Sequence, residues 1–343
     1  MKIQRRTTPY NRSNGGYIME YLERVNFGAK FEPDGNYILH GTGQYDIYEQ
    51  FSSYDRYRQY LPHTPPIMTI AFIGLYDDVR YDLFAALINT HIATYTDNSY
   101  VLPQIGVEFC RGELEGSNYE HEIAAGERDD EIRKFMMALK AIQRPVFIRP
   151  GYGFNGEWNG YDPEDYKAAF RRMREIMEEV QCQNVCFVWN YNPAAREKDY
   201  MKYYPGDEYV DWWGIDIFQT PEESAPYAYT FLEDAEKRKK PVMLGEATAY
   251  RYGTTYEGWQ KWFVAYFEYI KKHPVIKAAC YVNWDWTQYA KWSNWGDCRI
   301  ETNEELVELY EKELSNPVWL NDTNKQRVQK LLDIEKWGLI CEF

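Results

Sequence analysis

The run from Ile148 to Trp158, IRPGYGFNGEW, has the composition of a catalytic loop, but its central position is a glycine, Gly153. The run follows the apolar segment PVFI, so we expect it to leave the C-terminal end of a buried strand. In a β/α barrel, this end of the strands holds the active site. A second apolar segment, VMLGE, ends in Glu246. A carboxylate at such a strand end is suited to nucleophilic or acid–base chemistry, and Gly153 is the position that needs an explanation.

Short apolar segments alternate with longer amphipathic segments along the chain. The expected strands are Tyr37–Gly41, Ile67–Ile73, Val101–Phe109, Pro145–Pro150, Val185–Asn190, Val210–Phe218, Val242–Glu246 and Ala278–Asp285. Helical patterns lie between them, such as Asp162–Val180, which Pro163 opens, and Thr255–Lys272. This alternation predicts an α/β protein, a (β/α)8 TIM barrel whose parallel strands are apolar on both faces. A doubly wound open sheet is the alternative, but no glycine-rich phosphate-binding loop follows the first segment.

The chain is expected to form a single barrel domain over residues 1–343. A lead-in of about residues 1–35 precedes the first expected strand, and a helical extension of about residues 316–343 follows the barrel. Within this extension, a helix is predicted near Thr323–Glu335. No low-complexity linker and no internal repeat indicates a second domain.

Charge and hydropathy exclude several classes of partner. The formal net charge of -14 argues against binding to nucleic acid, which requires clustered Lys and Arg. No apolar run is long enough to span a bilayer, so no membrane association is expected. The first residues lack the apolar core of a secretory signal, which predicts a cytoplasmic protein or a secreted one whose signal is absent from this chain. The sequence does not indicate an oligomeric state.

Cysteine and aromatic content point away from a metal centre and toward sugars. The six cysteines and five histidines show no metal-ligand spacing, so we expect packed thiols and neither a metal nor another cofactor. Aromatic residues make up 17% of the chain, with 32 Tyr and 12 Trp. Aromatic faces on a concave surface stack well on sugar rings. The expected partner is therefore an oligo- or polysaccharide.

The motifs at the strand ends resemble those of the retaining (β/α)8 glycoside hydrolases with catalytic glutamates on strands 4 and 7. The nearest likeness is to glycoside hydrolase family 26, which includes β-mannanases and β-1,3-xylanases. It is carried by IRP and NGEW on either side of Gly153, by DWWGID at residues 211–216, and by Gly245-Glu246. The likeness spans roughly residues 35 to 300 and follows the order of all eight expected strands.

The resemblance implies roles for two positions. Glu246 corresponds to the nucleophile of the family. The strand-4 motif of the family resembles RPxHExNGxW, which places its histidine at Tyr152 and its acid/base glutamate at Gly153. This sequence therefore departs from the family pattern at the acid/base. Glycine offers no proton, and loss of a positioned general acid lowers the rate by a factor on the order of 10² to 10⁴.

Three explanations of Gly153 remain open at this point. The glycine is an engineered replacement of a parental glutamate, or the protein is a natural pseudoenzyme that binds glycans, or the acid has moved elsewhere. Strand alternation places Gln104, Gly106 and Glu108 on one face, which makes Glu108 the first candidate for a relocated acid. The same alternation groups Val242 and Leu244 with Glu246. Glu157 is instead expected to be a solvated loop carboxylate or a distal sugar contact.

Further substrate-binding residues are expected at the strand ends. Three tryptophans are candidate sugar platforms, and the polar residues are candidates for binding sugar hydroxyls or orienting Glu246. The candidates are Trp158, Trp284, Trp286, Tyr152, Asn155, Asp216, Tyr191, Arg149, Glu108 and His40. Each has a structural alternative, such as an ion pair of Arg149 with Glu246 or Glu108, core packing for the tryptophans, and a buried structural role for His40.

Taken together, these features predict an endo-acting, retaining glycoside hydrolase on a neutral β-linked polysaccharide of the mannan, xylan or glucan type, in a form that lacks its acid/base. The alternative from another class is a carbohydrate-binding protein on a hydrolase scaffold. An aldolase or a phosphate-sugar isomerase is disfavoured. Neither a Schiff-base lysine at a strand end nor a glycine-rich phosphate loop after strands 7 and 8 is present.

Overall fold

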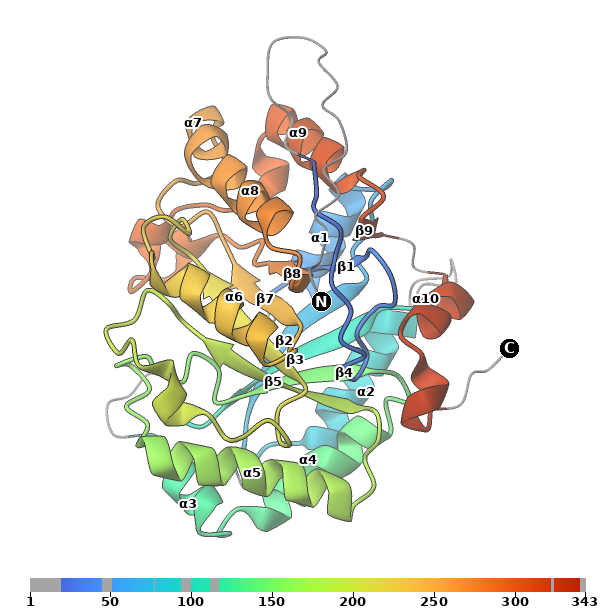
Figure 1. The fold of residues 1–343 in the computed structure, drawn as a ribbon, viewed down its shortest axis with the longest axis vertical. Coiled ribbons are helices and arrows are strands. Elements are labelled where there is room, and N and C mark those ends of the chain that lie inside the picture. The colour runs from blue at the N-terminus through green and yellow to red at the C-terminus, as the bar shows by residue number, and fades with distance from the viewer. Residues whose placement is uncertain are drawn as a thin grey trace, which may run out of the picture.

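The computed structural model describes residues 20–44, 51–76, 78–93, 100–111, 117–321 and 324–339. Eight parallel strands form a closed barrel with helices around its outside (Figure 1). The strands are β1 Ile38–Thr42, β2 Met68–Gly74, β3 Leu102–Glu108, β4 Val146–Pro150, β5 Val185–Tyr191, β6 Trp212–Ile217, β7 Val242–Ala247 and β8 Ile276–Tyr281. Each strand pairs with the next in sequence, and β1 closes the ring by pairing with both β8 and β2. The predicted (β/α)8 barrel is confirmed.

Burial explains why these segments form strands. All seven residues of β5 are buried, as are all six of β6, β7 and β8. A parallel strand with a filled barrel on one face and helices on the other has no solvent side, so it shows no alternation of polar residues. Strand β8 is the least accurate prediction, because it ends at Tyr281 and not at Asp285.

Helices cover the outside of the barrel. They are α1 Ser52–Tyr60, α2 Tyr81–Ala93, α3 Glu120–Ala124, α4 Asp129–Lys140, α5 Pro163–Glu179, α6 Tyr227–Lys237, α7 Tyr256–Gly258, α8 Val264–Lys272, α9 Glu304–Leu314 and α10 Lys325–Leu331. Helix α5 begins as predicted, with Pro163 in its first turn and the Asp162 side chain accepting hydrogen bonds from two backbone N–H groups. The predicted helix at Thr255–Lys272 contains a π-helical turn, Trp259–Phe263, between α7 and α8. No helix in these described ranges is long and apolar enough to cross a membrane.

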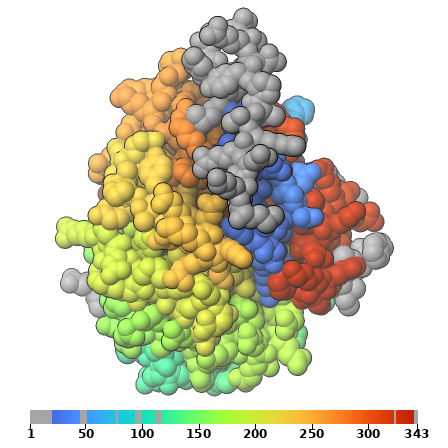
Figure 2. All heavy atoms as spheres, viewed as in Figure 1, coloured from blue at the N-terminus to red at the C-terminus, as the bar shows by residue number. Residues whose placement is uncertain are grey.

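The segments before and after the barrel pack on it. Residues 20–36 lie against the N-terminal ends of the strands, where Phe31 contacts Phe147 of β4 and the Lys30 carbonyl accepts a hydrogen bond from Trp212 of β6. Phe31 also contacts Trp337, which follows α10 in a short 3-10 turn. Figure 2 shows this blue N-terminal segment beside the red C-terminal residues. The described part of the lead-in therefore closes the base of the barrel.

The C-terminal extension also adds a strand that the sequence did not predict. Strand β9, Trp319–Leu320, pairs in parallel with the first residues of β1, Ile38 and Leu39. The helix predicted near Thr323–Glu335 is shorter, because α10 ends at Leu331 and Asp333 adopts a left-handed conformation. Cys341 lies outside the described residues, and the other five cysteines are buried thiols as expected.

Candidate active site

A cavity of about 760 Å³ opens at the C-terminal end of the barrel. Every strand contributes to it through its last residues or through the loop that follows. In the order β1 to β8, these residues include Gln44, Phe72, Glu108, Gly153, Asn192, Asp216, Glu246 and Trp286. Its position and size are those of an active site in this fold.

Glu246 faces the cavity from β7 and is held from below by Arg149 of β4. The Nη1 atom of Arg149 lies 2.9 Å from Oε1 of Glu246 and 3.6 Å from Oδ1 of Asp216 on β6. Arg149 is fully buried, and the side chains of Asp216 and Glu246 are only 3% and 9% exposed. Burial alone would lower the pKa of Arg149, but the charges of Glu246 and Asp216 outweigh it and raise that pKa. One permanently charged guanidinium therefore lies within ion-pair distance of two carboxyl groups.

A β-bulge at Gly245 brings these groups together. Ile215 pairs with Leu244, but the next residue, Asp216, pairs with Glu246, so Gly245 is the extra residue in β7. A Cβ atom at Gly245 would clash with the Asn190 side chain of β5 and would also crowd the Arg149 guanidinium beneath Glu246. Glycine at this position thus lets the interior side chains approach the strand.

The same bulge contradicts part of the predicted alternation. Val242, Leu244 and Glu246 were expected to share one face of β7. Inside the barrel, however, the Nε2 atom of Gln104 lies 3.8 Å from the sulfur of Met243 and donates a hydrogen bond to the Gly245 carbonyl at 2.9 Å. The expectation of a shared face was wrong because the register shifts between Leu244 and Glu246.

Gly153 lies in the cavity wall in a left-handed conformation. Its φ is +61°, its N–H donates to the Asn190 carbonyl at 3.0 Å, and its own carbonyl accepts a hydrogen bond from Asn159 at 2.9 Å. A Cβ atom here would meet only Trp158 at 3.6 Å and Asn159 at 3.9 Å, which is ordinary contact. The cavity therefore has room for a side chain at residue 153, but the backbone favours glycine by about 1–2 kcal/mol.

Glu108 and Tyr152 form a second polar group in the cavity wall. The Tyr152 hydroxyl donates to one oxygen of Glu108 at 3.3 Å. The Tyr76 hydroxyl lies 3.2 Å from the other oxygen and donates to the Cys110 carbonyl at 2.5 Å. Burial, with the charges of Glu108 and Glu246, raises the pKa of Tyr152 well above its usual range, so this phenol stays protonated. The Tyr152 ring also lies over the Arg149 guanidinium, 4.9 Å from its centre. Glu108 is thus held as a hydrogen-bond acceptor at the rim.

The loop after β8 supplies an aromatic wall. Trp286, Tyr289, Trp292 and Trp295 all line the cavity and are spaced by three residues. Two 3-10 turns in this loop, each with about three residues per turn, favour the projection of such residues to one side. The rings of Trp286 and Trp295 lie 4.8 Å apart. Trp286 is thus placed as the sequence suggested, although it lies in a loop and not in a strand.

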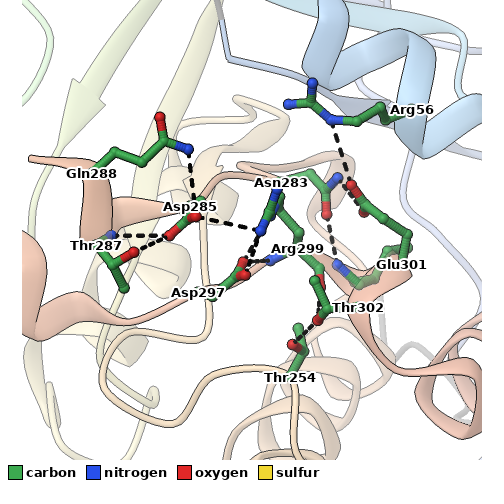
Figure 3. A network of polar contacts seen from close by, with 11 residues as sticks. Arg56, Thr254, Asn283, Asp285, Thr287, Gln288, Asp297, Arg299, Glu301 and Thr302 are labelled. Carbon is green, nitrogen blue, oxygen red and sulfur yellow. Dashed lines mark hydrogen bonds and ion pairs between the residues drawn. The ribbon is translucent and has the colours of Figure 1, made fainter.

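An ionic network anchors this aromatic loop (Figure 3). Arg299 donates to both oxygens of Asp297, at 2.9 and 2.6 Å, and its Nη2 atom also donates to Asp285 at 3.3 Å. Asp285 and Asp297 form an antiparallel bridge. Backbone hydrogen bonds from Trp286 N–H to the Gly296 carbonyl and from Cys298 N–H to the Trp284 carbonyl close the loop on each side of that bridge. Arg299 therefore ties together the two ends of the loop.

Trp158 is the most exposed of the predicted platforms. It follows β4, lines the cavity and is 45% exposed. Trp284, by contrast, is 2% exposed and is not part of the lining, but it stacks on Tyr289 with ring centres 6.3 Å apart. Glu157 pairs with the exposed Arg196 at 3.6 Å, which agrees with the loop carboxylate expected there.

His40 and Asn155 do not line the cavity. His40 lies within β1, bonded to the Tyr57 hydroxyl at 2.7 Å and to Asn321 at 2.9 Å, and burial lowers its pKa to about 3. Asn155 is buried and donates to the Asn192 carbonyl at 2.8 Å, which ties the β4 loop to the β5 loop. Both residues have structural partners, so neither is placed to bind a substrate.

Tyr191 is also removed from the cavity. It is fully buried at the end of β5, where its ring stacks on Phe231 at 5.0 Å and packs against Tyr200 at 5.0 Å. It was expected to bind sugar hydroxyls or to orient Glu246. The residue beside Glu246 is Asp216, which the sequence also singled out, while Asn190 of β5 connects Asp216 to the β4 loop.

Sequence reasoning missed much of the cavity wall. The missed residues include Asn159, Tyr161, Phe218, Gln219, Tyr250, Tyr289, Lys291, Trp292 and Trp295. The spacing of Trp286, Tyr289, Trp292 and Trp295 was a signal present in the sequence. The remaining missed residues lie in other loops, and the paths of these loops depend on tertiary contacts. Among the described residues, no group of three or more His, Cys, Asp or Glu side chains is arranged to hold a metal ion.

Comparisons with known proteins agree with this architecture. The family model described as Glycosyl hydrolase family 26 matches residues 111–273. A β-1,3-xylanase of Alcaligenes sp is 25% identical over 59% of this chain and 49% of its own length. A mannan endo-1,4-β-mannosidase of Bacillus subtilis is 31% identical over 29% of this chain and 30% of its own length. The chain spans about half the length of the β-1,3-xylanases it matches.

Solved structures share the fold. A mannanase of Bacillus subtilis superposes with a TM-score of 0.59 and 17% identity, over 88% of this chain and 91% of the mannanase. A β-mannanase of family 26 from Bacteroides ovatus gives a TM-score of 0.55 and 15% identity, over 82% and 87% of the two chains. At these identities the likeness concerns the fold alone. The family-model match over residues 111–273, the sequence relatives and the shared fold together show that this (β/α)8 barrel is similar to glycosyl hydrolase family 26.

Proposed function

We propose that this protein binds a neutral β-linked polysaccharide in the cavity and that Glu246 acts there as the nucleophile of an endo-acting, retaining glycoside hydrolase. The observation that carries the proposal is the placement of Glu246. It is a buried carboxylate at a barrel strand end, held 2.9 Å from Arg149 and facing a cavity with aromatic walls. A charged, oriented carboxylate beneath a sugar-sized cavity is what attack on an anomeric carbon requires.

The proposed site lacks a second carboxyl group at residue 153. A retaining hydrolase uses two carboxyl groups about 5–5.5 Å apart, one as nucleophile and one as acid and base. Gly153 supplies neither proton nor base. Sugars are poor leaving groups without protonation, so we propose that polysaccharide cleavage by this form is impaired. A donor whose leaving group departs as a stable anion, such as 2,4-dinitrophenolate, does not need the missing acid.

Two observations bear on the origin of Gly153. The left-handed backbone at residue 153 favours glycine, which supports a natural glycine and with it the alternative of a glycan-binding pseudoenzyme. The room around this residue for a larger side chain supports replacement of a parental glutamate. A relocated acid at Glu108 has less support, because one of its oxygens already accepts a hydrogen bond from the Tyr152 hydroxyl.

The relatives suggest which polymers to test first. The β-1,3-xylanases of Alcaligenes sp and Vibrio sp each match 59% of this chain, and the Bacillus subtilis mannosidase acts on mannan, as its name states. We therefore propose β-1,3-xylan and β-1,4-mannan as the first substrates, with β-glucan as the third.

The test measures reducing ends released from these three polymers by the protein, by its Gly153→Glu variant and by Glu246→Gln. We expect Gly153→Glu to cleave one polymer faster than the parent by a factor on the order of 10² to 10⁴, and Glu246→Gln to be inactive. Equal rates for the parent and Gly153→Glu would place the acid elsewhere. If the parent binds a polymer that Gly153→Glu does not cleave, and no variant reacts with dinitrophenyl glycosides, the protein is a glycan-binding pseudoenzyme.

A further inference from the structure

Arg149 faces more acidic groups than it can neutralise. Asp216 and Glu246 lie on neighbouring strands, and each has an oxygen directed at the same guanidinium nitrogen, at 3.6 and 2.9 Å. All three side chains are buried or nearly so. If both carboxyl groups were ionised, this nearly buried cluster would carry an uncompensated negative charge, which is unfavourable.

The geometry shows which carboxyl group is the weaker partner of Arg149. Glu246 makes the closer contact, so it is the group whose charge Arg149 stabilises more. Asp216 accepts one hydrogen bond from the Asn190 side chain at 2.8 Å through Oδ2. Its Oδ1 atom is the one that faces Arg149, at 3.6 Å, which is beyond hydrogen-bond distance. Arg149 therefore stabilises a negative charge on Asp216 less than one on Glu246.

We propose that Asp216 holds a proton while Glu246 is a carboxylate, and that it releases this proton when Glu246 becomes a glycosyl ester. Arg149 would then face one negative charge in the free protein, on Glu246, and one in the glycosyl ester, on Asp216. This inference rests on the proposed function, because it assigns a charge-balancing role to Asp216 in the step that Glu246 performs. Asp216 is here a positioning residue, since it acts on Glu246 through Arg149.

The electrostatics of the cluster agree with this assignment. Burial, and then the charge of Glu246, raise the pKa of Asp216 to about 8, while Arg149 and the Asn190 side chain act in the opposite direction. The groups that face Asp216 are thus Arg149 from β4, Asn190 from β5 and Glu246 from β7. Tyr152 lies over Arg149 and stays neutral. Esterification removes the charge of Glu246, and the guanidinium then favours ionised Asp216.

The charges and atoms of the step balance as follows for a 2,4-dinitrophenyl 2-deoxy-2-fluoroglycoside. A Glu246 oxygen forms a bond to the anomeric carbon, and the bond from that carbon to the phenolic oxygen breaks. The electron pair leaves with dinitrophenolate, which remains an anion at neutral pH. The O–H bond of Asp216 then breaks and its proton passes to water. One proton is therefore released for each ester formed, whereas a permanently ionised Asp216 would release none.

The first experiment needs no sugar. Infrared difference spectra at pH 7 compare the protein with Asp216→Asn, and Glu246→Gln with the double variant Asp216→Asn/Glu246→Gln. In the comparison of the protein with Asp216→Asn, we expect the carbonyl band of a protonated carboxyl group. In the comparison made on the Glu246→Gln background, we expect the bands of a carboxylate. The neutral amide at position 246 leaves Asp216 as the only one of the two groups that can pair with Arg149 as an anion. A carboxylate in the first pair, or a protonated carboxyl group in the second, would overturn the inference. Circular dichroism checks that each variant is folded.

The second experiment measures proton release in weak buffer with a pH indicator, using 2,4-dinitrophenyl 2-deoxy-2-fluoro-β-xylobioside, mannobioside and cellobioside. Mass spectrometry counts the esters on Glu246. We expect about one proton per ester in the protein and none in Asp216→Asn. Esters without proton release would contradict the inference and leave the proposed function intact. No ester with any donor would contradict the proposed function, and the infrared result would then decide the protonation of Asp216 by itself.

Discussion

The Nη1 atom of Arg149 lies 2.9 Å from Oε1 of Glu246, and both groups are shielded from solvent at the centre of the barrel. Replacement of Arg149 by Met leaves two buried carboxyl groups without their shared counter-charge. We expect the free energy of unfolding to fall by about 3–5 kcal/mol, measured by urea denaturation at pH 7. The matched control is Arg196→Met, since Arg196 is 90% exposed and pairs with Glu157 in solvent. Equal destabilisation by both changes would contradict the structural role of Arg149.

The space beside Gly153 predicts chemical rescue by small anions. Once a dinitrophenyl glycoside has formed an ester on Glu246, no residue at position 153 activates water for the second step. Azide needs no such activation and is small enough for a site where a Cβ atom meets nothing closer than 3.6 Å. We expect azide to raise turnover by at least about tenfold, within the range that acid–base catalysis contributes, and to give a β-glycosyl azide.

The control for this rescue is Gly153→Glu, whose carboxylate fills the site and repels the anion. We expect its turnover to be insensitive to azide. An α-glycosyl azide from the parent, identified by nuclear magnetic resonance, would mean that the reaction does not pass through a covalent intermediate on Glu246.

Trp158 tests whether an exposed loop indole is a sugar platform. Because the side chain is 45% exposed, Trp158→Ala should leave the thermal midpoint nearly unchanged. Loss of one stacking contact should weaken polysaccharide binding by about tenfold, which corresponds to about 1.4 kcal/mol, as measured by titration calorimetry on the Glu246→Gln background. Tyr256→Ala, at a residue that is 60% exposed and outside the cavity lining, is the control. Equal affinities in Trp158→Ala and the control would assign Trp158 no role in binding.

Arg299 tests how the aromatic loop is held. Arg299→Met removes the bonds to Asp285 and Asp297 that join the two ends of this loop (Figure 3). We expect KM for long oligosaccharide donors to rise by about tenfold with kcat unchanged, because the loop contributes binding and not the reacting groups. Donors too short to reach the loop should show no change. A fall of kcat for short donors as well would mean that Arg299 supports the whole cavity.

The protonation of Asp216 also predicts how stability depends on pH. Its pKa is raised in the folded state, so the stability that it contributes is fully present below the unfolded value near 4 and is lost as pH rises through about 8. Between pH 5 and pH 8, the parent should therefore lose up to about 4 kcal/mol of unfolding free energy relative to Asp216→Asn. Urea denaturation at the two pH values measures this difference. Glu164→Gln, at a side chain that is 82% exposed, should show no such trend.

Much of the barrel could be predicted because its strands and helices depend on local patterns. Residues such as those of β5 are buried on both faces and form an apolar run, and Asp162 and Pro163 mark the start of α5 in any context. Residues at the C-terminal ends of the strands lie at the cavity, so a predicted strand end also predicts which residues line it. For that reason the positions of Glu246 and Asp216 at the cavity could be predicted from sequence alone.

Predictions failed where distant residues decide the outcome. Tyr191 and His40 lie at or near strand ends, but each points into packed side chains that no local pattern reveals. The extra residue at Gly245 shifts the register of β7 because Asn190 and Arg149 occupy the interior beside it. The end of β8 at Tyr281 follows from the closed loop that Arg299 anchors, so Trp284 and Trp286 leave the sheet.

The sequence by itself determined the family likeness, the order of the barrel strands and the absence of a carboxylate at residue 153, because each depends on residue type and spacing along the chain. Only the tertiary structure decided how the charges at the centre are shared. Arg149, Asp216 and Glu246 come from three strands, and burial removes the solvent that would otherwise screen them. The tertiary structure also set the left-handed backbone at Gly153, since Asn190 and Asn159 fix that loop from other parts of the chain.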